Sequence, residues 1–117
     1  MKEYLLLIRE DFSTYGNISP EEMQKSIEAH IKWVEKLVLN GNFKGGNPLS
    51  PEGKIIKGQN NLVTDGPFIE LKEGISGYYF LLANSLSEVT EIAKGCPSLA
   101  MDNATLEIRE ILNTDEE

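Results

Sequence analysis

His30 is the residue best suited to proton transfer, because it is the only histidine among the 117 residues of the chain. An imidazole gains and loses a proton near neutral pH, so it can serve as a general acid or base. For that role it needs a carboxylate to orient it, and spacing along the chain does not say which one. A histidine that faces a core also commonly serves as a hydrogen-bonded structural residue, and the sequence leaves both roles open.

Asp65 begins a second group of polar residues. The sequence Asp65-Gly66-Pro67-Phe68 is typical of a tight turn, because aspartate accepts backbone N–H bonds, glycine permits positive φ and proline restricts its own φ. A dense alternation of charge follows over Glu70-Leu71-Lys72-Glu73, and charges in a loop are usually solvated. Tyr78 and Tyr79 then alternate faces on an expected strand, where one hydroxyl can reach a cleft although core packing is the commoner role.

Cys96 is the single cysteine, which excludes an intrachain disulfide and, with one histidine, any Cys/His zinc cluster built by one chain. It precedes Pro97 at the end of an expected helix, and a helix C-terminus is the wrong end to activate a thiol. A metal site from His30, Asp65 and another carboxylate has no spacing signature. We therefore expect no metal and no other cofactor.

The charge of the chain argues against nucleic acid as a partner. Of the net charge of −8, −6 lies in residues 86–117, where eight acids face two bases. A nucleic-acid binder needs a basic face. The longest apolar run, residues 4–8, is shorter than the ~7–15 apolar residues of a signal peptide or the ~20 of a membrane helix. We expect a cytoplasmic protein with no membrane partner.

A helix must position His30, and Ser19-Pro20-Glu21-Glu22 predicts its start. Serine suits the N-cap, proline suits the first helical position, and Glu22 completes a capping box. Asn40-Gly41 is typical of a helix end with a left-handed residue. On a helical wheel, seven residues fall within an arc of roughly 120° and are expected to face the core: Met23, Ile27, His30, Ile31, Val34, Leu37 and Val38.

Strands are expected on both sides of this helix. Residues 4–8 and 77–83 are continuous apolar runs, as in central strands, and residues 105–111 alternate as in a strand with one buried face. Further short strands are expected at 43–49, 53–58 and 61–64, and a loop at 65–76. A second capping box at Ser85 opens a short helix whose inner face is expected to hold Leu86, Val89, Ile92 and Ala93.

These elements predict a single domain over residues 1–117. Two helices and a mostly antiparallel sheet fit most simply when both helices cover one face of the sheet, so the expected fold class is α+β, a ferredoxin-like sandwich. The other face would stay bare in one chain, although residues 4–8 and 77–83 look apolar on both faces. Because a large exposed apolar patch usually marks an interface, we expect a homodimer joined through the sheet faces.

The motif around Asp65 resembles a known family signature. The run Val63-Thr64-Asp65-Gly66-Pro67-Phe68-Ile69-Glu70-Leu71-Lys72-Glu73, followed by Gly77-Tyr78-Tyr79, is similar to that of the YCII-related proteins, in particular their DGPF subgroup. The opening strand, Cys96-Pro97 and the run from Leu106 to Arg109 also fit, so the resemblance spans nearly the whole chain. It implies a dimeric α/β-barrel made of ferredoxin-like protomers.

The resemblance also implies a site. In the YCII-related family a helix histidine and a loop aspartate are a proposed active-site pair. His30 matches the position of that histidine, and Asp65 is the best candidate for its partner. One branch looks like dehydrochlorinases of chlorinated hydroxyquinones, which implies a small-molecule pocket and acid/base chemistry without a cofactor. In this hypothesis His30 is the acid or base, Asp65 orients it, and the substrate-binding residues are Arg109, Tyr78 and Phe68.

A second function stays open beside the enzyme. Members of the family are often associated with extracytoplasmic-function sigma factors, so the resemblance also implies a non-catalytic ligand-binding or regulatory module with a sigma-factor-type partner. The lack of any self-sufficient catalytic motif in the chain agrees with this alternative.

Overall fold

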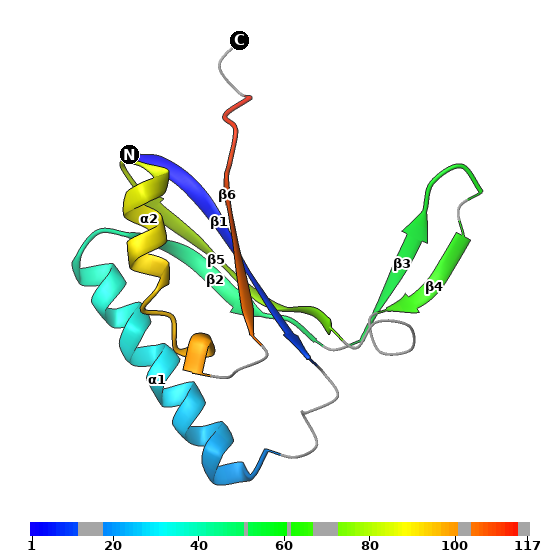
Figure 1. The fold of residues 1–117 in the computed structure, drawn as a ribbon, viewed down its shortest axis with the longest axis horizontal. Helices are drawn as coiled ribbons and strands as arrows, with labels where there is room; N and C mark the ends of the chain where they lie inside the picture. Colours follow the sequence, from blue (N-terminus) through cyan, green and yellow to red (C-terminus); the bar gives the residue numbers. More distant parts are fainter. Residues whose placement is uncertain (12–17, 51, 61, 67–72, 101–103, 115–117) are drawn as a thin grey trace.

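A four-stranded antiparallel sheet carries two helices on one face, as Figure 1 shows for this computed structural model. The structure describes residues 1–11, 18–50, 52–60, 62–66, 73–100 and 104–114, with only the backbone at 64–66 and 73. In chain order the elements are β1 (Lys2–Asp11), α1 (Pro20–Leu39), β2 (Phe43–Pro48), β3 (Gly53–Lys57), β4 (Leu62–Gly66), β5 (Glu73–Ala83), α2 (Leu86–Ala93), the 3-10 turn η2 (Pro97–Ala100) and β6 (Thr105–Glu110).

The strand order of the main sheet is β2-β5-β1-β6, and all its neighbours are antiparallel. With the separate β3–β4 hairpin set aside, this is the strand order of a ferredoxin-like sandwich, which confirms the expected α+β fold class. The expected loop over 65–76 is wrong at both ends, while residues 67–72 lie outside the described residues. Backbone pairing of Lys54 with Asp65 and of Asp11 with Glu73 extends β4 and β5 into it.

The core lies between the sheet and the helices. Alternate residues of β1 and β5 point inward, as the two-residue period of a strand requires. They pack against the buried residues of the two helices, Trp33 and Leu37 in α1 and Val89 and Ala93 in α2. The buried apolar side chains are Tyr4, Leu6, Ile8, Trp33, Leu37, Leu81, Ala83, Val89, Ala93 and Cys96.

Both ends of α1 form as the sequence predicts. The amide of Glu22 donates to the hydroxyl of Ser19 at 3.1 Å, and Gly41 takes a φ of +75° just after the helix. The expected inward arc, however, is only partly right. Trp33 and Leu37 are the buried residues of α1, and His30 and Val34 are half-buried. The arc residues on the other side are exposed: Met23, Ile27, Ile31 and Val38.

This difference has a packing reason. The helix has a sheet beneath it and no second layer over its outer side, so only one edge of a wide apolar arc is covered. The indole of Trp33 fills the covered edge and meets the Tyr79 ring edge-on, with ring centroids 5.3 Å apart. Leu86 is likewise exposed against expectation, because α2 meets the sheet along Val89 and Ala93 and Leu86 lies beyond the end of that row.

The β3–β4 hairpin, here called the arm, stands apart from the main sheet on the side opposite the helices (Figure 1). Within the described part of the chain its two strands form a separate two-stranded sheet, with Ile56 opposite Val63. In the described part of the chain, neither helix has the length and hydropathy needed to cross a membrane.

Candidate functional site

The His30 imidazole is held by hydrogen bonds at both ring nitrogens. Its Nδ1 lies 2.8 Å from the carbonyl oxygen of Ser26, one turn earlier in α1, and its Nε2 lies 2.9 Å from the hydroxyl of Ser98 in η2. A carbonyl only accepts, so Nδ1 must carry a proton and donate it. In the neutral ring Nε2 is then the acceptor, and the Ser98 hydroxyl donates to it. This is the protonation pattern of a base whose reactive atom is Nε2.

Ser98 reaches His30 because of the turn that follows α2. At the end of that helix the backbone amides of Gly95 and Cys96 donate hydrogen bonds to the carbonyls of Ile92 and Ala93. The amide of Leu99 then donates to the carbonyl of Cys96, which closes the η2 turn. Ser98 is buried in this turn, with 5% of its surface exposed. The half-buried His30 therefore faces the η2 turn.

Cys96 lies near Ser98, and its buried thiol is not an activated nucleophile. Burial raises the pKa of its thiol, and the hydrogen bond from the Ser98 amide only partly opposes that rise. Burial likewise raises the pKa of Tyr79 to about 12, with a smaller contribution from the neighbouring Cys96 thiolate. Neither group is ionised near neutral pH, which agrees with the expectation that Cys96 is no nucleophile.

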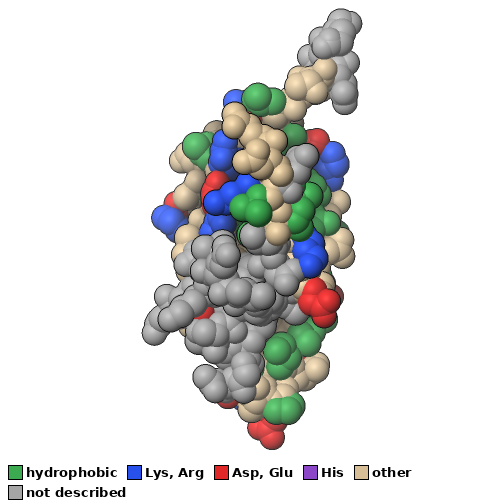
Figure 2. Space-filling view, turned by 90° about the vertical axis from the view of Figure 1, so that its right-hand side faces the viewer, with side chains coloured by type: hydrophobic (Ala, Val, Ile, Leu, Met, Phe, Trp, Pro, Cys, Tyr) green, Lys and Arg blue, Asp and Glu red, His purple; other side chains and the backbone are tan. Residues whose placement is uncertain are grey.

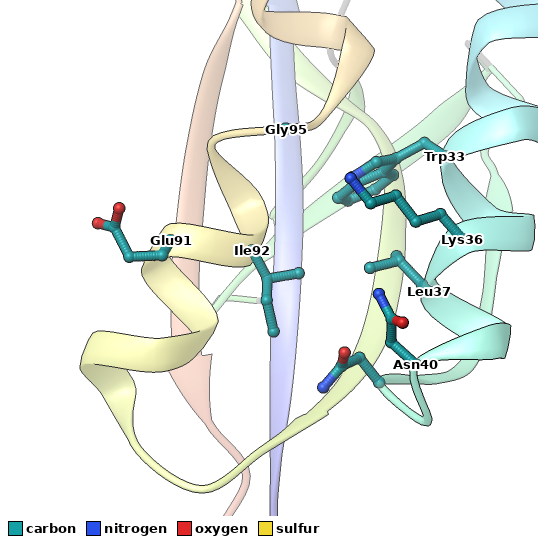
Figure 3. A pocket seen from close by; sticks show the side chains of 8 residues that line it. Trp33, Lys36, Leu37, Asn40, Glu91, Ile92 and Gly95 are labelled. Carbon is teal, nitrogen blue, oxygen red and sulfur yellow. The ribbon is translucent and has the colours of Figure 1, made fainter.

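A groove of about 360 Å³ lies between α1 and α2, beginning one turn after His30 in α1 and ending about one turn before Ser98 on the other side. Its lining residues are Trp33, Lys36, Leu37, Asn40, Asn42, Glu91, Ile92 and Gly95. Figure 3 shows Trp33, Leu37 and Ile92 projecting into the space between the helices, so its floor is aromatic and aliphatic. A Cβ at position 95 would lie 3.1 Å from the indole Nε1 of Trp33, so the glycine lets α2 pass close to the ring.

Among the residues that the structure describes, one positive charge at the rim of the groove, that of Lys36, is not neutralised by an ion pair. Lys36 forms no ion pair with another described residue, and Figure 3 shows it running along the Trp33 side of the groove. The carboxylate of Glu91 turns away from α1 and is paired with Lys94 at 2.7 Å. Asn42 donates its side-chain amide to the carbonyl of Leu82 at 2.8 Å.

The expected partner of His30 is carried by another part of the fold. The backbone of Asp65 belongs to β4 in the arm, whereas α1 lies on the other side of the main sheet (Figure 1). The side chain of Asp65 and all of Phe68 lie outside the described residues. The Nδ1 of His30 is instead hydrogen-bonded to the Ser26 carbonyl within α1.

Two further predicted residues, Tyr78 and Arg109, lie on the open face of the sheet, the face that the helices do not cover. In the strand register Tyr78 is opposite Leu7 and Arg109 is opposite Leu5, out of phase with the buried residues of β1. Arg109 is largely exposed and bonded to Glu107 at 3.4 Å. Within one chain the sheet thus separates these two side chains from His30.

Glu107 joins two arginines on the open face. It accepts from Arg9 at 3.0 Å as well as from Arg109, and these bonds, chiefly that of Arg9, lower the pKa of its carboxyl. Among the described residues, no group of three or more His, Cys, Asp and Glu side chains is arranged to hold a metal ion.

Comparison with known proteins places the chain in a family. A family model described as the YCII-related domain matches residues 2–115. The chain belongs to the YCII-related family. Among solved structures, At3g17210 of Arabidopsis thaliana is 14% identical, with a TM-score of 0.43 and coverage of 100% of this chain and 99% of that chain. That likeness is too distant to inform function, and no curated protein matches this YCII-related chain.

Sequence reasoning missed three residues of this YCII-related site. Trp33 lies just outside the expected arc, although its position three residues after His30 is a signal that both share one side of α1. Lys36 comes three residues after Trp33, but nothing in the sequence distinguishes it from an ordinary surface lysine. Ser98 is 68 residues from His30, and nothing in the local pattern of either residue announces their contact.

Proposed function

We propose that this YCII-related protein binds a small molecule in the groove between α1 and α2. The observation that carries the proposal is the composition of the groove, an aromatic and aliphatic floor beside the ammonium group of Lys36, which pairs with no acid among the described residues. Sites for small molecules are commonly apolar clefts with a few polar groups that fix orientation. The chemistry favours a ligand with a flat apolar body and one anionic group, such as an aromatic carboxylate.

The only tryptophan of the chain is Trp33, so its fluorescence reports on this groove alone. The test is a titration with three probes of similar shape and different charge: phenylacetate, phenylethanol and phenylethylammonium. We expect phenylacetate to bind at least about tenfold more tightly than phenylethylammonium, because one ammonium group favours the anion by more than about 1.4 kcal/mol in a partly desolvated site.

Substitution of two lysines on the same helix separates the groove from a general charge effect. Lys36→Gln is expected to weaken phenylacetate binding about three- to tenfold, whereas Lys32→Gln, on the exposed side of α1, leaves it unchanged. Equal affinity for all three probes, or equal effects of the two substitutions, contradicts the proposal.

A second candidate function is acid/base chemistry at His30. It is supported by the bond of Nδ1 to the Ser26 carbonyl, which leaves Nε2 as the proton acceptor. A substrate proton would move to Nε2, and the imidazolium would return it to a second atom of the same molecule. In this proposal the Ser26 carbonyl orients the ring, and the involvement of Asp65, Arg109, Tyr78 and Phe68 stays a prediction, as does membership of the DGPF subgroup.

Diethyl pyrocarbonate tests this candidate directly, because it acylates unprotonated imidazole and the chain has one histidine. If Nε2 meets substrates, it should react at a rate comparable to free imidazole, and Ser98→Ala should speed the reaction. If Asp65 assists, Asp65→Asn should slow it. A native protein that resists the reagent until it unfolds has a structural histidine only, which would exclude the chemistry while leaving groove binding intact.

We also propose that the protein is a homodimer joined through the open faces of two sheets. Leu5 and Leu7 of β1 stand opposite Phe80 and Tyr78 of β5 on that face, and the two aromatic rings pack edge-on at 5.4 Å. Ion pairs surround this apolar centre, including Lys44 with Glu3 at 2.6 Å. An apolar centre with a charged rim is typical of protein interfaces.

Light scattering tests the dimer with a matched pair of variants. The wild-type protein should have twice the 13.1 kDa mass of one chain at micromolar concentration. Leu7→Lys should yield monomers, because it places a charge within the apolar centre. Ile31→Lys, on the exposed side of α1, should remain dimeric. A wild-type mass of a single chain contradicts the proposal.

A further inference from the structure

Ser98 and His30 have the arrangement of a nucleophile and its base. The Ser98 hydroxyl donates to Nε2 of His30 at 2.9 Å, and Nδ1 on the other side of the ring donates to the carbonyl oxygen of Ser26 at 2.8 Å. A serine hydroxyl is a weak nucleophile until an adjacent base accepts its proton, and a third group holds that base in position. All three groups are present here, in α1 and in the η2 turn.

We infer that Ser98 is a nucleophile that accepts an acyl group from a carboxylic ester, with His30 as its general base. This inference deepens the second candidate function, because the proton that Nε2 accepts then comes from Ser98 itself. The Ser98 Oγ forms a bond to the carbonyl carbon of the ester while its proton moves to Nε2. The imidazolium returns that proton to the alcohol oxygen as the carbon–oxygen bond of the ester breaks. The alcohol leaves, and the acyl group remains on Ser98.

The Ser98–His30 pair lies at one end of the groove between α1 and α2. Trp33 lines the groove three residues after His30, and Gly95 lines it three residues before Ser98. Ser98 is 5% exposed, whereas Leu99 beside it is 43% exposed and His30 is half-buried, so the hydroxyl lies just below the surface. This position favours a flat acyl carbonyl on an apolar body that the aromatic and aliphatic floor of the groove can hold.

The backbone around Ser98 limits how fast the acyl group can leave. Acyl transfer is fast when free backbone amides stabilise the negative charge that develops on the carbonyl oxygen. The Leu99 amide donates to the Cys96 carbonyl at 3.1 Å, and the Ser98 amide donates to the Cys96 thiol. Because both of these amides are occupied, we expect the acyl group to accumulate on Ser98 instead of being hydrolysed rapidly.

p-Nitrophenyl acetate tests the inference, because its acyl group is small and its coloured leaving group departs readily. We expect a burst of about one p-nitrophenolate per chain, followed by slow turnover. Peptide mass spectrometry of the wild-type protein should then find the acetyl group on Ser98, a result that needs no variant. The burst rate should rise with pH to a plateau, because only the neutral imidazole accepts the proton.

Exposed lysines are the background of this experiment. Figure 2 shows Lys and Arg side chains at the surface on the side of the arm. A lysine amine is protonated near neutral pH, so its acetylation is slow and gives no burst.

Three substitutions identify the groups that react. Ser98→Ala should abolish the burst. His30→Gln can still form a hydrogen bond with the Ser98 hydroxyl but accepts no proton from it, so the burst should slow at least about a hundredfold. Ser87→Ala removes an exposed hydroxyl from α2 and is the matched control, which should keep the wild-type burst.

The outcomes separate this inference from acid/base chemistry at His30 alone. Acetyl groups on lysines or on His30 but not on Ser98 overturn the inference, as does an unchanged burst in His30→Gln. If diethyl pyrocarbonate modifies the native ring while Ser98 accepts no acetyl group, the inference fails and the second candidate function stands. A ring that resists diethyl pyrocarbonate in a protein whose Ser98 accepts no acetyl group overturns both.

Discussion

At the scale of single residues, the carbonyl of Ser26 decides the chemistry available to His30. It accepts from Nδ1 at 2.8 Å and so selects the neutral form in which Nε2 lacks a proton. The Ser98 hydroxyl then donates to Nε2 at 2.9 Å. A substrate that needs this nitrogen must displace a buried hydroxyl, so Ser98 controls access to the base.

The first prediction concerns this form of the ring. Nitrogen-15 NMR of the single imidazole should show neutral His30 protonated at Nδ1, the form less common for free imidazole side chains. Ser98→Ala removes the competing donor and should leave that form in place, because the Ser26 carbonyl still selects it. It should also lower the free energy of unfolding by about 1 kcal/mol, measured in urea. A neutral ring protonated at Nε2 in the wild type contradicts the assignment.

The second prediction concerns Tyr4, which is 1% exposed and whose hydroxyl has no hydrogen-bond partner among the described residues. A buried hydroxyl without a partner costs about 1–3 kcal/mol of desolvation. Tyr4→Phe should therefore keep or raise the free energy of unfolding, by up to about 1 kcal/mol in urea titrations. A clear loss of stability in Tyr4→Phe means that the hydroxyl has a partner.

At the scale of elements, the join between β2 and β5 depends on Gly46. A Cβ there would lie 2.5 Å from the Tyr79 ring and 2.7 Å from the carbonyl oxygen of Tyr78. The ring is held by Trp33 and Phe43, and the carbonyl is backbone, so neither can move away cheaply.

The third prediction follows from this contact. Gly46→Ala should lower the free energy of unfolding by about 1–3 kcal/mol. Gly45→Ala is the matched control, because no atom lies within 4 Å of its added Cβ, and it should change stability by less than about 0.5 kcal/mol. Urea unfolding of both variants measures the difference. Equal effects mean that the β2–β5 join is looser than the structure shows.

The same elements show what the sequence can predict. Helix ends depend on neighbours in the chain, so the Ser19 cap and the turn at Gly41 are predictable from local chemistry alone. Which edge of α1 is buried depends on the Trp33–Tyr79 contact, and a helical wheel contains no information about that partner. The His30–Ser98 contact could not be predicted for the same reason, since it joins residues that are 68 positions apart in the chain.

At the scale of the whole molecule, the sheet separates two kinds of surface. The helix side holds the groove and His30, while the open face holds apolar side chains bordered by ion pairs. In our proposals, ligand binding therefore uses the helix side and association uses the open face. Tyr79 points to the helix side of the sheet, where its ring contacts Trp33 of α1 and its hydroxyl lies near Cys96.

The last prediction concerns the response of the fold to alkaline pH. Tyr79 has its pKa raised to about 12 and Cys96 has a raised thiol pKa, so the folded state keeps these protons more tightly than the unfolded chain. Their stabilising contribution is complete below the unfolded values of 10.0 and 9.0 and is lost as pH rises toward the folded ones. The free energy of unfolding should therefore fall from about pH 9 toward pH 12.

Urea titrations across this range measure the slope, and a variant identifies its source. Tyr79→Phe keeps the ring beside Trp33 but has no proton to lose, so its stability should fall less steeply with pH than that of the wild type. Lysine deprotonation contributes equally to both proteins and cancels in the comparison. Parallel curves for Tyr79→Phe and wild type would show that the Tyr79 hydroxyl is as well solvated in the folded state as in the unfolded chain.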